Sequence, residues 1–82
     1  MDKLPVLSGE KLLKALLKEG FVVLRQKGSH VIVSKEMDGE AVSFPVPLHK
    51  GRNIKPGTLN GILHSAGISK DRLKYLLTLV LL

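Results

Sequence analysis

The tripeptide Gly28-Ser29-His30 places a side chain that can transfer protons at a predicted reversal of the chain. The segments on either side, 21–26 and 31–34, are rich in β-branched and apolar residues, which is typical of β-strands. Gly28 accepts a positive φ and Ser29 can hydrogen-bond its own backbone, so both suit a tight turn. An imidazole has an unperturbed pKa of about 6.5 and can accept or donate a proton near neutral pH. We therefore expect His30 at the mouth of a hairpin, within reach of solvent.

A second histidine, His49, opens the basic loop 49–53. It could be a second proton-transfer group or a phosphate contact, or it could only shape the loop before the next helix. His64 falls among the apolar positions of a predicted helix, offset from the buried face, and is given no functional role. Three histidines can bind zinc, but their spacing and the absence of cysteine make a metal site improbable. We predict that the protein uses no metal and no cofactor.

Length and charge indicate a small domain with an anionic partner. The chain has 82 residues, 44% of them hydrophobic, which predicts one domain over 1–82. Its net charge of +6 points to a nucleic acid, an acidic protein or both. The first residues contain no apolar h-region, so we expect no secretory signal, and the longest apolar run, 76–82, is far shorter than the roughly 20 residues that span a bilayer. We therefore expect a cytoplasmic protein with no membrane association.

Basic residues near the two histidines are candidates for contacts to backbone phosphates, which would give salt-dependent affinity. The alternative for each is a solvated basic loop. The turn residue Ser29 belongs with these candidates rather than with nucleophiles, because no base and orienting acid are evident beside it. The candidate set is Lys27, Ser29, Lys50, Arg52 and Lys55. The helix that starts near Pro56 could also direct free N–H groups at a phosphate.

The elements that position these residues can be predicted from spacing and capping residues. Ser8 is a good N-cap, Leu12, Leu13, Leu16 and Leu17 recur at helical spacing, and Gly20 ends the helix. A turn over 35–40 leads to a strand over 41–44, which Pro45 and Pro47 close. Leu59, Ile62, Leu63 and Ala66 predict the buried face of a helix from Pro56 to Gly67, and Ser69 caps a short last helix with Leu73, Leu76 and Leu77 on its apolar side. This order predicts an α+β fold, αβββα plus a short terminal helix, with helices on one face of a three-stranded antiparallel sheet.

The stretches SGEKLLKALLKEGF, RQKGSH and P-L-HKGRNIKPGTLNGILHSAGIS together resemble the HicA family of toxins, which are messenger RNA interferases. The resemblance runs from about Leu7 to Leu77. Leu48 departs from it, because that position is often polar in the family, and the apolar end 79–82 runs past the usual terminus.

The resemblance implies a fold like the double-stranded-RNA-binding domain and metal-independent endonucleolytic cleavage of messenger RNA. It places the family's catalytic histidine on His30 and implies a HicB-type antitoxin as partner. From the residues alone, His30 could instead be an ordinary turn histidine. The runner-up function is a non-catalytic RNA-binding module, and a third possibility is a protein whose basic face serves only an acidic partner.

Overall fold

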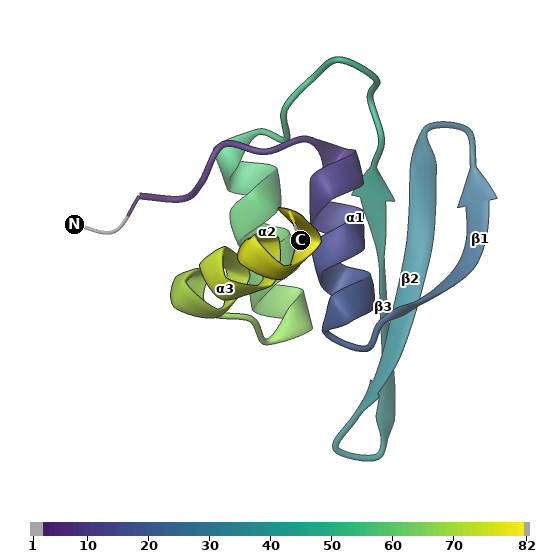
Figure 1. Ribbon diagram of the computed structural model, residues 1–82. Coiled ribbons are helices and arrows are strands. Elements are labelled where there is room, and N and C mark those ends of the chain that lie inside the picture. Colours follow the sequence, from purple (N-terminus) through teal and green to yellow (C-terminus); the bar gives the residue numbers. More distant parts are fainter. Residues whose placement is uncertain (1–2, 82) are drawn as a thin grey trace.

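The computed structural model describes residues 3–81, and its element order confirms the predicted arrangement. The strands form one antiparallel sheet in the order β1-β2-β3, and the helices lie on one side of it (Figure 1). The α+β class is therefore confirmed. Residues 1, 2 and 82, among them the last residue of the apolar end, lie outside the described range. The elements are α1 (Gly9–Lys18), β1 (Val22–Lys27), β2 (His30–Met37), β3 (Glu40–Pro47), α2 (Pro56–Ala66) and α3 (Lys70–Leu81).

Helix α1 begins and ends where its capping residues predict. The Ser8 hydroxyl accepts a hydrogen bond from the backbone N–H of Lys11 at 3.2 Å. Gly20, just beyond the C-cap, has a φ of 107°, which residues with a side chain rarely adopt. One predicted apolar position differs, because Leu17 is 44% exposed. The residues that α1 buries are Gly9, Leu12, Ala15 and Leu16.

Two strands are longer than predicted, and the turn between them is correspondingly shorter. The turn is Asp38-Gly39, with φ values of 52° and 81°. Pairing of β2 with β3 continues from Met37 opposite Glu40 to His30 opposite Pro47. The prolines were expected to close the strand, but β3 lies at an edge of the sheet, where a missing N–H leaves no ladder partner unsatisfied. The far end of this hairpin extends beyond the helices in Figure 1.

The hydrophobic core lies between the sheet and the helices. Alternate residues of β2 and β3 point into it, as the period of two in a strand requires. The rings of Phe21 and Phe44 meet in this core with centroids 5.3 Å apart, and both side chains are buried. All four predicted positions of α2 are buried. The least exposed large side chains are Leu12, Leu16, Val33, Val46, Leu59, Leu73 and Leu76.

Helix α3 was predicted to be short, and this prediction is wrong because the helix has 12 residues. Its start is as expected, since the Ser69 hydroxyl accepts a hydrogen bond from the backbone N–H of Arg72 at 3.0 Å. Leu73 and Leu76 are fully buried, so packing sustains the helix well past its first turns. No helix within residues 3–81 combines the length and the apolar character that crossing a membrane requires.

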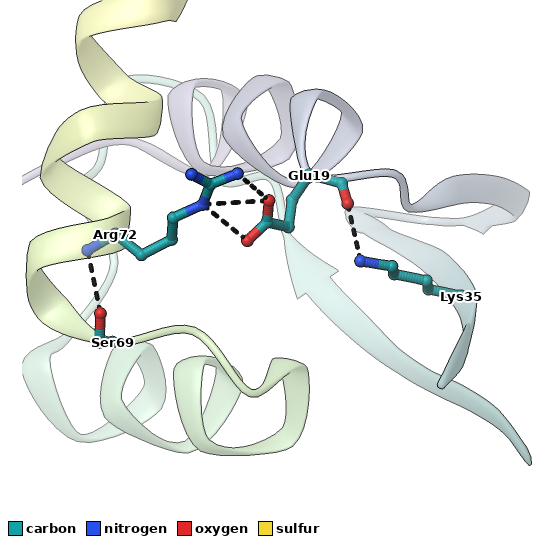
Figure 2. Close-up of polar contacts among 4 residues, drawn as sticks. All are labelled: Glu19, Lys35, Ser69 and Arg72. Carbon is teal, nitrogen blue, oxygen red and sulfur yellow. Dashed lines mark hydrogen bonds and ion pairs between the residues drawn. The ribbon is translucent and has the colours of Figure 1, made fainter. Parts of the chain in front are cut away.

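An ion pair joins the end of α1 to the start of α3. Figure 2 shows the Arg72 guanidinium on both carboxylate oxygens of Glu19, with Nη2 at 2.7 Å from Oε1 and Nε at 3.1 Å from Oε2. The Lys35 ammonium of β2 donates to the backbone oxygen of Glu19 at 2.8 Å. The hydrogen bond from Arg72 lowers the pKa of the Glu19 carboxyl, and burial opposes this only in part. Glu19 therefore connects the end of α1 with both α3 and the sheet.

Candidate active site

The hairpin between β1 and β2 holds His30 at the first position of β2. Gly28 and Ser29 form the turn, as predicted, and Gly28 has a φ of 60°. His30 pairs with Lys27 on one side and with Pro47 on the other, so it lies on the middle strand of the sheet. Its side chain is exposed, which confirms the expectation that solvent reaches it. A rigid ladder therefore fixes the backbone of an accessible imidazole.

The loop that carries His49 is tied to the rest of the fold by backbone hydrogen bonds. The N–H of Leu48 donates to the carbonyl of Ser29 at 2.6 Å, which joins the loop to the turn before His30. The N–H of Arg52 donates to the carbonyl of His49 at 3.0 Å, and the N–H of Ile54 donates to the carbonyl of Leu7 at 2.9 Å. These bonds hold both ends of the loop, so the position of His49 is determined by its surroundings.

The two imidazoles face each other across this junction. The ring centroids of His30 and His49 are 6.0 Å apart, and the ring planes meet edge to face at 83°. Both side chains are exposed. At this distance each imidazole can offer a donor or an acceptor to a group bound beside the pair.

The histidine pair opens into a cleft of about 340 Å³. The cleft runs from the histidines to the first turn of α2, and its basic side chains are Arg52 and Lys55. No acidic residue lines it, so the cleft favours an anion. Its lining consists of His30, Pro47, His49, Arg52, Asn53, Ile54, Lys55 and Thr58.

The start of α2 adds to this positive character. Pro56 occupies the first turn, as predicted, and Lys55 at the N-cap makes no side-chain cap to the helix. The first turn has no acidic residue. The partial positive charge of a helix N-terminus therefore adds to the charges of Arg52 and Lys55.

The structure gathers four of the seven predicted site residues in the cleft and leaves three outside its lining. The four are His30, His49, Arg52 and Lys55. Lys50 lines a neighbouring hollow of about 220 Å³ next to the start of α1. Lys27 is an exposed residue of β1, and Ser29 contributes its backbone carbonyl to the Leu48 contact.

The sequence did not point to the polar residues Asn53 and Thr58 in the lining. From the sequence, Asn53 is expected only to belong to a loop and Thr58 only to the start of a helix. Neither carries a charge or recurs at a spacing that would mark it. The one available signal was their place between the basic loop and a helix N-terminus. Across residues 3–81, no three His, Cys, Asp or Glu side chains form a group that could hold a metal ion.

A basic cleft with two facing histidines on an α+β scaffold can bind an anion and move protons beside it. The chain belongs to the HicA toxin family, because the family model for the HicA toxins of bacterial toxin–antitoxin systems matches residues 9–68. This range contains every residue of the cleft, whereas α3 lies beyond it. The resemblance seen in the sequence is thereby confirmed.

A D-alanine–D-alanine ligase of Syntrophobacter fumaroxidans (strain DSM 10017 / MPOB) is 34% identical to the chain over 61 residues. The aligned region covers 74% of the chain and 20% of the ligase, so the chain spans about a fifth of that protein's length. No solved structure matches the chain. The likeness to the double-stranded-RNA-binding domain therefore stays a prediction.

Proposed function

We propose that this HicA-family protein is a metal-independent endoribonuclease that cleaves messenger RNA in the cytoplasm. The observation that carries the proposal is the juxtaposition of His30 and His49, 6.0 Å apart at the mouth of a basic cleft. Membership of a toxin family supports it, because destruction of messenger RNA stops growth.

The chemistry needs only groups that the RNA and the two histidines supply. One imidazole removes the proton from a 2′-hydroxyl while that oxygen attacks the adjacent phosphorus. The other imidazole acts as imidazolium and protonates the departing 5′-oxygen as its bond to phosphorus breaks, leaving a neutral ring, a 2′,3′-cyclic phosphate and a 5′-hydroxyl. Hydrogen bonds of about 2.6–3.2 Å to each ring allow one phosphate to reach both histidines. Tight placement of the 2′-hydroxyl in line with the leaving oxygen lowers the barrier further.

The cations of the cleft stabilise the charge that develops on the phosphate. Arg52 and Lys55 line the same cleft as the histidines, so they are placed to contact the scissile phosphate or its neighbour. Lys27, Ser29 and Lys50 lie outside that lining, and they contact the RNA farther along its backbone.

The proposed partner is an antitoxin of the HicB type. A toxin of this kind has to be silenced until it is needed, and the family belongs to toxin–antitoxin systems. The net charge of +6 suits an acidic surface as well as RNA. An antitoxin that covers the cleft would compete with RNA for Arg52 and Lys55.

The test is cleavage of a messenger RNA in excess chelator by the purified parent and by three histidine variants. We expect His30→Ala and His49→Ala each to lower the cleavage rate by about 10²–10⁴-fold, the usual contribution of a placed acid or base. His64→Ala is the matched control, since His64 is an exposed histidine of α2 outside the cleft lining. Unchanged far-UV circular dichroism and melting would show that each variant is folded.

The outcomes separate the candidate functions. Full cleavage by folded His30→Ala would contradict the assignment of His30, and full cleavage by folded His49→Ala would refute the two-histidine mechanism. Parent protein that shifts RNA in a gel without cutting it would favour the RNA-binding module. Cleavage that disappears in chelator and returns with a divalent cation would contradict metal independence.

A further inference from the structure

We infer that the cleft beside the histidine pair is a subsite for one unstacked nucleobase of a single-stranded RNA, recognised by Asn53 and Thr58. This inference rests on the proposed function for its choice of ligand. It adds a role for the part of the cleft that proton transfer and phosphate binding leave unused.

The walls of the cleft suit the flat faces of a base. Pro47 and Ile54 are the apolar residues of the lining, and Pro47 is the more accessible of the two, since Ile54 is only 9% exposed. Both are held by the backbone, since Pro47 ends the β3 ladder and the N–H of Ile54 is bonded to the Leu7 carbonyl. Residues that are already fixed lose little conformational entropy when a planar ring packs against them.

The polar groups of the cleft suit the edge of a base. The Asn53 amide offers a donor next to an acceptor, and the Thr58 hydroxyl offers either. Within residues 3–81, neither side chain has a hydrogen bond to the protein, so both are available to a ligand. The backbone of Asn53 is fixed by a bridge to Ser8, which limits where its amide can go. Amide side chains commonly read base edges through such paired contacts.

The size of the cleft selects a single base over a duplex. Ligand pockets span roughly 300–1,000 Å³, and about 340 Å³ is at the small end of that range. A base can enter only after it leaves its stack, which costs least in a single strand. A duplex would have to bind through backbone contacts alone, with the cleft empty. The subsite therefore predicts a preference for single-stranded RNA.

Binding of 2′-fluoro RNA tests the subsite without cleavage, because this RNA has no 2′-hydroxyl nucleophile. The same mixed sequence is offered to the parent as a single strand and as a blunt duplex. We expect the single strand to bind at least about tenfold more tightly. Asn53→Ala should weaken single-strand binding about five- to tenfold and leave duplex binding unchanged. Asn60→Ala is the matched control, since Asn60 is exposed on α2 and lies outside the cleft lining.

Salt dependence separates a base contact from a phosphate contact. Asn53→Ala should leave the slope of log affinity against log salt unchanged, whereas Lys55→Ala should reduce it by about 0.7. Equal affinity for both forms of RNA, no binding to either, or unaltered binding by folded Asn53→Ala would overturn the subsite. A parent that binds single strands selectively but leaves unmodified RNA intact would refute the nuclease and keep the subsite.

Discussion

Gly9, the first residue of α1, is where the helix meets the end of β3, and replacing it with alanine tests that junction. A Cβ built on Gly9 would collide with the carbonyl oxygen of Pro47 and lie 3.1 Å from Cδ2 of Leu48. Gly61 of α2 is the matched control, because a Cβ built there meets nothing within 4 Å. Both glycines are helical, so the two substitutions differ mainly in the space available to the new methyl group.

Two opposing effects set the expected magnitude. Replacing glycine by alanine in a helix stabilises the fold by about 0.5–1 kcal/mol, and Gly61→Ala should show this gain in full. Overpacking costs about 1–3 kcal/mol, and Gly9→Ala should fall at the upper end because the obstacle is backbone rather than a flexible side chain. The expected net loss for Gly9→Ala is therefore about 2 kcal/mol. For a domain of 82 residues, this lowers the melting temperature by about 10 °C.

Urea unfolding, monitored by circular dichroism, gives the free energy of unfolding of both variants and the parent. The added methyl group would push Pro47 away from α1. Because Pro47 lines the cleft and precedes the His49 loop, folded Gly9→Ala should also cleave RNA more slowly. Gly9→Ala with a stability equal to or above that of the parent would refute the close approach of α1 to β3. A loss in Gly61→Ala as large as that in Gly9→Ala would refute the argument from space.

Three further predictions concern the supports of the fold. Leu73→Ala empties a fully buried position of α3 and should cost about 2–5 kcal/mol, measured as a lower urea midpoint; a cost below 1 kcal/mol would contradict the packing of α3. Ser8→Ala removes the acceptor of the Lys11 N–H and should cost about 0.5–2 kcal/mol, seen in the same assay; an unchanged midpoint would contradict the cap. Because Arg72 lowers the pKa of Glu19 from its ordinary 4.5, the carboxylate stabilises the fold at neutral pH and this contribution is lost as the pH falls through the lowered pKa. Glu19→Gln should therefore flatten the acid limb of stability against pH, and an identical acid limb would contradict the pair.

Local features of the sequence were sufficient to predict most of the fold. Ser8, Gly20, Pro56 and Gly67 each mark a helix end through a capping or backbone requirement that is independent of distant residues. The lengths of β2 and β3 were underestimated because pairing continues through charged and proline residues whose partners lie on the neighbouring strand. The length of α3 was underestimated for a similar reason, since Leu79 and Val80 of its last turns are partly buried against the core.

The candidate site was predicted in its chemistry and only in part in its geometry. The histidines and two of the cations stood out by residue type, and the structure brings them together. Asn53 and Thr58 have no distinctive type or spacing, so only the path of the loop from Pro47 to α2 places them beside His30. The same path turns Lys50 toward a separate hollow, although it is the immediate neighbour of His49 in the chain.

The pairing of His30 with Pro47 explains how residues from two segments form one site. His30 begins β2 and Pro47 ends β3, so the two lie opposite each other at the end of the ladder farthest from the Asp38-Gly39 turn. His49 is two residues beyond this pair, and the Leu48 hydrogen bond to Ser29 turns the chain back toward His30. A slip of one residue in the register would move Val31 and Val33 out of the core, so the core resists it. The packing that stabilises the sheet therefore also fixes the separation of the two histidines.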